Sequence, residues 1–92
     1  MFYYVYVIQS KIDNDLYIGY TADLKRRLND HNQGKNISTR KNRPWELIHY
    51  EAYKNIIDVK RRERYLKTSQ GARLLKRMLK EYFYNNKKDN YE

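Results

Sequence analysis

Four side chains in this sequence have types that act on phosphate groups and positions that predict burial among apolar neighbours. Two are the tyrosines Tyr6 and Tyr17, and the others are Arg27 and Glu63. The planar guanidinium of an arginine matches two phosphate oxygens. A carboxylate is a hard oxygen ligand for a divalent cation, and a phenol positions or activates a water molecule. If the fold gathers these four groups, phosphoryl transfer is the chemistry that they favour.

Arg27 lies next to the buried stripe of a predicted helix over about residues 23–32. Leu24 and Leu28 mark that stripe. A rotation of about 100° per residue places Arg27 and His31 beside it. An arginine at an apolar face needs an anionic partner, so a structural salt bridge and a phosphate contact are both open. Three roles are open for His31: a phosphate contact, a proton shuttle, or a hydrogen-bonded histidine at a helix end, which is the default.

Glu63 lies on the inner stripe of another predicted helix, over about residues 56–68. Val59 and Leu66 mark this stripe, and Glu63 falls between them. Its carboxylate either pairs with Arg27 or binds Mg²⁺ or Mn²⁺. Magnesium in proteins needs only one or two carboxylates, because water and phosphate oxygens complete its shell. Spacing alone leaves the ion pair and the metal site equally open.

Tyr6 and Tyr17 are predicted on adjacent antiparallel strands, over residues 2–9 and 16–20. Their side chains approach each other if the register allows. Gly19 lies two residues after Tyr17 and leaves room beside the sheet. An aromatic pair that fills the core is the alternative. Buried tyrosine hydroxyls need hydrogen-bond partners, and a carboxylate and a guanidinium are expected nearby.

The order of the predicted elements is β-β-α-β-α-α. It indicates a small α/β fold with a three-stranded antiparallel sheet flanked by helices. Both faces of the first strand are apolar, so this strand is expected at the centre of the sheet. We assign one domain to residues 1–84 and a polar tail to residues 85–92. The elements are predicted over residues 2–9, 16–20, 23–32, 45–53, 56–68 and 72–84, with a break at 69–71.

The composition favours an anionic partner. The 92 residues carry 20 Lys and Arg against 11 Asp and Glu, a formal net charge of +9. Nucleic acid is the commonest partner of so basic a domain, with DNA expected first and RNA second. The absence of cysteine excludes disulfides and thiolate metal sites. Neither a signal peptide nor a membrane span is indicated, so we expect a cytoplasmic protein, either a monomer or a weak homodimer.

Basic residues outside the candidate site are expected to bind the nucleic-acid backbone. They lie in a polar loop over residues 35–43 and on the outer face of the last predicted helix. Contacts to phosphates carry no base information, so weak sequence preference is expected. These residues are Lys35, Arg40, Lys41, Arg43, Arg73, Lys76, Arg77 and Lys80.

Two short segments, Tyr4-Val5-Tyr6 and Tyr17-Ile18-Gly19, resemble the motifs for which the GIY-YIG nuclease family is named. The second motif is intact, whereas the first has tyrosine where the family name has glycine. The resemblance extends over about residues 3–80 and is supported by Asp30-His31-Asn32 and Arg62-Glu63-Arg64. The chain looks like the small standalone members, which are related to the N-terminal domain of the bacterial excision-repair incision nuclease.

The resemblance implies a metal-dependent endonuclease that holds Mg²⁺ or Mn²⁺ on Glu63. Arg27 would stabilise charge on the phosphoryl oxygens. Tyr17 would take a proton from the attacking water, and Tyr6 would orient it. His31 matches a histidine that some members use. The alternative is a nucleic-acid-binding module of the same fold that cuts poorly or not at all.

Overall fold

The computed structural model describes residues 1–89, with side chains for residues 1–85, and confirms the predicted α/β fold. Within the described residues no helix is both long and apolar enough to cross a membrane. The elements are β1 (Tyr3–Ser10), β2 (Leu16–Thr21), α1 (Leu24–Asn32), a short 3-10 turn (Arg40–Asn42), β3 (Trp45–Tyr53), α2 (Ile56–Leu66), α3 (Ser69–Met78) and α4 (Lys80–Asp89).

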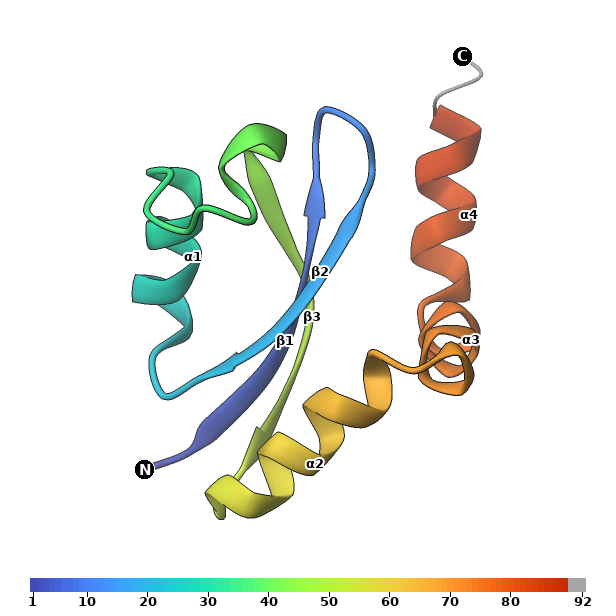
Figure 1. The fold of residues 1–92 in the computed structure, drawn as a ribbon. Coiled ribbons are helices and arrows are strands. Elements are labelled where there is room, and N and C mark those ends of the chain that lie inside the picture. Colours follow the sequence, from blue (N-terminus) through green and yellow to red (C-terminus); the bar gives the residue numbers. More distant parts are fainter. Residues whose placement is uncertain (90–92) are drawn as a thin grey trace.

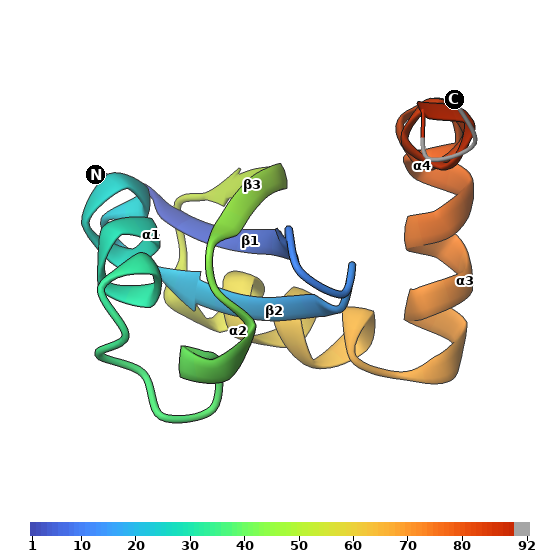
Figure 2. The ribbon, with the colours of Figure 1, turned by 90° about the horizontal axis from the view of Figure 1, so that it is seen from above.

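The sheet is antiparallel with strand order β2-β1-β3, so β1 is central as predicted. Helix α1 lies on one face of the sheet and α2, α3 and α4 lie on the other (Figure 1), and the view from above shows the same layers (Figure 2). The core beneath α1 contains Tyr6, Ile8 and Trp45. The core beneath α2 contains Val5 and Leu66. Burial of each aliphatic side chain stabilises the folded state by about 1.5–3 kcal/mol. Because β1 contributes buried side chains to both cores, it joins the two helix layers.

A β-bulge in β3 changes which of its residues face each helix layer. The pairing with β1 shifts between Val7 and Ile8, where Ile48 is the extra residue. An extra residue reverses the alternation of side chains along the strand. Trp45 therefore packs beneath α1, whereas Tyr53, further along the same strand, packs beneath α2.

The last predicted helix, over residues 72–84, is two helices. Helix α3 ends at Met78, and Leu79, with φ −107° and ψ 27°, interrupts the helical backbone before α4 begins. Residues 85–89, predicted as part of the polar tail, continue α4. Residues 90–92 of that predicted tail lie outside the described residues.

Helix α3 begins earlier than predicted because its first turn packs against the end of α2. A Cβ atom at Gly71 would overlap the backbone of Tyr65 and Leu66, so only glycine permits this approach. The side chain of Thr68 accepts a hydrogen bond from the Gly71 N–H and caps the helix. Residues 69–71, predicted as a break, are therefore helical.

Candidate active site

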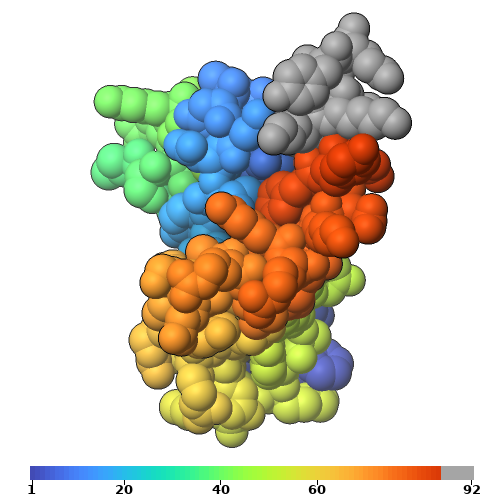
Figure 3. Space-filling view, turned by 90° about the vertical axis from the view of Figure 1, so that its right-hand side faces the viewer, coloured from blue at the N-terminus to red at the C-terminus, as the bar shows by residue number. Residues whose placement is uncertain are grey.

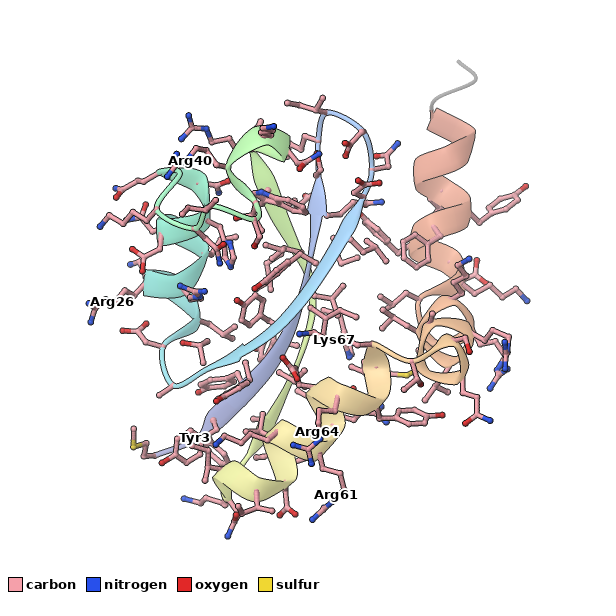
Figure 4. All side chains as sticks on the ribbon, viewed as in Figure 1. Tyr3, Arg26, Arg40, Arg61, Arg64 and Lys67 are labelled. Atoms are coloured by element: carbon pink, nitrogen blue, oxygen red, sulfur yellow. The ribbon has the colours of Figure 1, made fainter. Side chains whose placement is uncertain are left out.

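A cleft of about 450 Å³ opens beside the edge strand β2 and brings the predicted tyrosine, arginine and glutamate side chains together. Tyr6 comes from β1, Tyr17 from β2, Arg27 from α1 and Glu63 from α2. Because α1 and α2 lie on opposite faces of the sheet, the cleft receives side chains from both helix layers. Figure 4 shows Lys67, at the end of α2, close to β2.

The hairpin register places Tyr6 directly opposite Gly19. A Cβ atom at Gly19 would lie 2.6 Å from the Tyr6 hydroxyl oxygen, so the phenol ring occupies the space that the glycine leaves. Tyr17 lies diagonally across the hairpin, and the two tyrosine ring centroids are 6.4 Å apart. The predicted approach of the two tyrosines is thus present, and the glycine sets the position of one of them.

A chain of hydrogen bonds runs from the cleft into the core. Arg27 Nε donates to the Tyr6 hydroxyl oxygen over 3.3 Å. The same hydroxyl lies 2.9 Å from His31 Nε2, and His31 Nδ1 lies 2.8 Å from the Thr39 hydroxyl. That hydroxyl donates to the backbone oxygen of Asn36 over 3.4 Å. His31 is 0 % exposed and Thr39 is 1 % exposed, so the inner half of the chain is shielded from solvent.

One arrangement of hydrogen atoms gives a partner to every polar group in this series of hydrogen bonds. If Thr39 donates to Asn36, it accepts from the Nδ1–H of His31, whose Nε2 then accepts from the Tyr6 hydroxyl. In the opposite tautomer, with the proton on Nε2, both His31 and Arg27 would donate to the Tyr6 oxygen. The Tyr6 proton would then have no acceptor among these hydrogen-bonded groups. Buried polar groups are paired in native proteins. Tyr6 therefore directs its proton at His31 and presents its oxygen to Arg27.

The electrostatics of the site keep both rings neutral. Burial, together with the charge of Arg27, lowers the pKa of His31 to about 4, so the imidazole is uncharged near neutral pH. Burial also raises the pKa of the Tyr6 hydroxyl and outweighs the hydrogen bond from Arg27, which acts in the opposite direction. A preformed phenolate is therefore disfavoured, and Tyr6 rests as a neutral hydroxyl.

Arg27 is bound to Tyr6 rather than to a carboxylate. Its hydrogen bond to Tyr6 is the largest cause that raises the pKa of the guanidinium, and Tyr17 adds to the effect. Within residues 1–85, the Glu63 carboxylate pairs with Lys67, over 2.8 Å, and no ion pair joins Glu63 to Arg27. The ion pair that the sequence left open for Arg27 is thus not the arrangement found.

The Glu63 carboxylate fits a divalent cation. Its side chain is 15 % exposed, lines the cleft and already binds one cation, the ammonium of Lys67. The described residues contain no cluster of three His, Asp or Glu side chains that would hold a metal by themselves. One carboxylate with exchangeable oxygens from water and substrate is a donor set that suits Mg²⁺ or Mn²⁺.

A second partly buried carboxylate fixes α2 on the sheet. Glu51 in β3 accepts hydrogen bonds from Arg62 Nε over 2.8 Å and from the Tyr53 hydroxyl over 2.7 Å. Its carboxylate also pairs with His49 Nε2 over 2.9 Å. Burial would raise the pKa of Glu51, but these partners outweigh it and lower the pKa to about 2. Because Arg62 precedes Glu63 in the chain, this anchor also sets where Glu63 reaches the cleft.

The predicted basic loop has contacts of its own. Lys35 pairs with Asp30 over 3.5 Å, and Arg40 Nε donates to the backbone oxygen of Gly34 over 3.0 Å. Figure 4 places Arg40 beside the C-terminal end of α1. Lys41 and Arg43 are also exposed. None of these four basic residues lines the cleft, so a role in nucleic-acid binding would lie beyond its rim.

The basic residues predicted on the last helix are all exposed but divide into two groups. Lys76 and Lys80 line hollows that adjoin β2, whereas Arg73 and Arg77 do not. Arg73 and Arg77 are four residues apart and share one face of α3. Lys76 and Lys80, by contrast, lie on either side of the interruption at Leu79.

Three residues near the site were not predicted. Lys67 pairs with Glu63 at the i,i+4 spacing typical of helical ion pairs, a signal that the sequence contains. The ammonium of Lys60 lies 5.9 Å from the ring of Tyr20, which lines the cleft. Thr39 lies in a loop without periodicity, and nothing in its neighbourhood indicates contact with a helix eight residues earlier.

Comparison with known protein families assigns this fold and cleft to one class of catalytic domain, the GIY-YIG domain. The family profile described as the GIY-YIG catalytic domain matches residues 2–78. The chain belongs to the GIY-YIG family, a family of nucleases, as the sequence predicted. Its relatives include proteins named UPF0213.

These relatives confirm the family and the fold. UPF0213 protein SH2523 of Staphylococcus haemolyticus is 38 % identical over 75 residues, which cover 80 % of this chain and 90 % of that protein. UPF0213 protein SAG0778 of Streptococcus agalactiae is 44 % identical over 61 residues, covering 65 % and 68 %. The solution NMR structure of UPF0213 protein BH0048 from Bacillus halodurans matches with a TM-score of 0.53 and 31 % identity over 85 % of each chain.

Proposed function

We propose that this domain is a divalent-metal-dependent endonuclease that hydrolyses phosphodiester bonds in DNA with weak sequence preference. The observation that carries the proposal is the convergence of Tyr6, Tyr17, Arg27 and Glu63 from four separate elements on one cleft. A site that only needed packing would hold apolar side chains, because burying polar groups costs free energy. The net charge of +9 suits a polyanionic substrate.

Arg27 binds the scissile phosphate. Its Nε–H is engaged by Tyr6, which orients the guanidinium and leaves the terminal N–H groups for phosphate oxygens. Charge that develops on those oxygens in the transition state is stabilised by the fixed guanidinium. A bound phosphate also offsets the positive charge of Arg27, which is one cause of the low pKa of His31. Substrate binding thereby makes His31 more basic.

Tyr6 and His31 act as a proton relay. The Tyr6 oxygen accepts a proton from the attacking water while its own proton passes to His31 Nε2, 2.9 Å away. The hydrogen-bond network favours Tyr6 for this role over Tyr17, which we expected from the sequence to take the proton, because of these two tyrosines only Tyr6 is bonded to His31. Tyr17 borders the same cleft and orients the water.

Glu63 holds the metal ion, Mg²⁺ or Mn²⁺. When bound, such an ion polarises a phosphate oxygen and stabilises the leaving group. Lys67 must release the carboxylate for this purpose, and its ammonium then becomes available to a substrate phosphate.

A cleavage assay with a matched pair of variants tests the proposal. Supercoiled plasmid, flap, junction and single-stranded DNA are incubated with Mg²⁺, Mn²⁺ or EDTA. Glu63→Gln removes the carboxylate of the cleft, whereas Asp58→Asn removes an exposed carboxylate of the same helix that pairs with Arg61. We expect metal-dependent cleavage by the wild type and by Asp58→Asn, and none by Glu63→Gln.

Two results would contradict the proposal. Cleavage that survives Glu63→Gln would place the metal site elsewhere. Absence of cleavage by the wild type, together with DNA binding that weakens steeply with salt, would establish the alternative of a binding module with this fold.

A further inference from the structure

Three hollows follow one another along the free edge of β2. The cleft borders Thr21 and shares Tyr17 with a hollow of about 360 Å³ between β2 and the start of α3. That hollow shares Leu16 and Lys76 with a third, of about 490 Å³, between the β1–β2 hairpin and α4. The space-filling view shows this side, with the hairpin in blue next to α3 and α4 in orange and red (Figure 3). The hollows therefore form one groove that leads out of the cleft.

The groove combines an apolar floor with ammonium groups. Its floor includes Ile18 and Leu75 in the second hollow and Phe83 in the third. Lys76 and Lys80 line it on the helical side, and both are exposed. This combination of aromatic and aliphatic surface with two ammonium groups is typical of sites that bind single-stranded nucleic acid, whose base faces are free to pack.

We propose that this groove, which we call the β2 groove, binds an unpaired DNA strand that continues from the scissile phosphate. The inference rests on the proposed function, since it gives that cleft a substrate with a single-stranded segment next to the cut. Phosphates pair with Lys76 and Lys80, and bases pack on Leu16 and Phe83. Asp15, at the hairpin end, is the acidic residue that lines the third hollow, so the favourable potential ends there.

A DNA duplex fits the β2 groove less well. In a duplex the bases are stacked and paired, so the phosphates would meet the lysines but no base face would meet the apolar floor. A peptide that adds a strand to the edge of β2 would use its backbone groups, and would not need the two ammonium groups. The charge and the apolar floor together favour an unpaired strand.

Binding of two DNA hairpins, measured by fluorescence anisotropy in EDTA, tests the β2 groove. One hairpin is blunt, and the other carries a short oligothymidine tail. Lys76→Ala/Lys80→Ala is compared with Lys54→Ala/Arg61→Ala, which removes the same charge from residues that line none of the three hollows. Phe83→Leu keeps an apolar side chain without the aromatic face.

We expect the wild type to bind the tailed hairpin more tightly than the blunt one. Lys76→Ala/Lys80→Ala should weaken tailed binding about tenfold and reduce its salt slope by about 1.4, the value for two single-strand phosphate contacts. The blunt hairpin and the control variant should be unaffected. Phe83→Leu should weaken tailed binding severalfold, with an unchanged melting temperature as evidence of folding.

Equal weakening of blunt and tailed binding would overturn the inference and identify the lysines as duplex contacts. An absence of any preference for the tail would also overturn it, and would be the result if a peptide were the occupant. These readouts need no catalysis. Failure of the groove is thus distinguished from failure of the nuclease proposal, which depends on Glu63→Gln.

Discussion

Replacement of Thr39 by valine tests the hydrogen-bond chain beneath the site. Valine keeps the branched shape but removes the hydroxyl that accepts from His31 Nδ1, 2.8 Å away. Trp45 Nε1 still donates to the backbone oxygen of residue 39 over 2.9 Å, so the loop stays in place. An unsatisfied buried donor costs about 1–3 kcal/mol. The ring avoids part of this cost if its proton moves to Nε2, from which it would donate to Tyr6.

The tautomer change would reverse the direction of proton transfer. The Tyr6 hydroxyl would lose its acceptor and turn its proton to the cleft, so it could no longer pass that proton to His31. General-base catalysis contributes about 10²- to 10⁴-fold, so DNA cleavage by Thr39→Val should fall within that range. The melting temperature should fall by no more than about 4–24 °C, since a cost of about 1–3 kcal/mol corresponds to roughly 4–8 °C per kcal/mol in a domain of this size. Thr39→Ser keeps the hydroxyl and should resemble the wild type.

The ¹⁵N chemical shifts of the His31 ring report the tautomer directly. The wild type and Thr39→Ser should carry the proton on Nδ1, and Thr39→Val should carry it on Nε2. A wild-type protein with the proton on Nε2 would refute the arrangement. A Thr39→Val variant with wild-type cleavage would refute its role in the reaction, whatever its stability.

Other perturbations reach different parts of the structure. Gly19→Ala would place a Cβ atom 2.6 Å from the Tyr6 hydroxyl oxygen, so we expect a loss of about 1–3 kcal/mol in urea denaturation together with slower cleavage. Glu51, whose pKa is lowered to about 2, contributes stability above its unfolded pKa of about 4.3, and this is lost as the pH falls towards 2. Glu51→Gln should be less stable at neutral pH and show a flatter profile across that window. Lys67→Met should bind Mn²⁺ more tightly than the wild type in titrations followed by electron paramagnetic resonance, because the ammonium no longer competes for Glu63; unchanged affinity would contradict this.

The face on which a side chain lies was accessible from the sequence wherever an element has a clear period. Leu24 and Leu28 define the buried side of α1 well enough to place Arg27 beside it, and the structure brings Arg27 to Tyr6. The helical stripe of α2 likewise places Glu63 at the cleft. In both cases the apolar neighbours set the orientation.

Features that depend on tertiary packing were not accessible. The bulge at Ile48 reverses the faces of β3, and a plain alternation pattern gives no sign of it. The interruption at Leu79 falls within a continuous helical pattern, so one helix was predicted where there are two. Thr39 meets His31 only because the loop folds back beneath α1, and no local period encodes such a contact.

The division of the site between two helix layers confines its chemistry to the fully folded chain. Tyr6 and Arg27 belong to the sheet and to α1, but Glu63 reaches the cleft only when α2 docks on the other face. On the proposed function, a nascent or proteolysed chain that lacks α2 is harmless to surrounding DNA even if its hairpin is formed. A chain divided between β3 and α2 would consist of two inert pieces that cut DNA only after they reassociate.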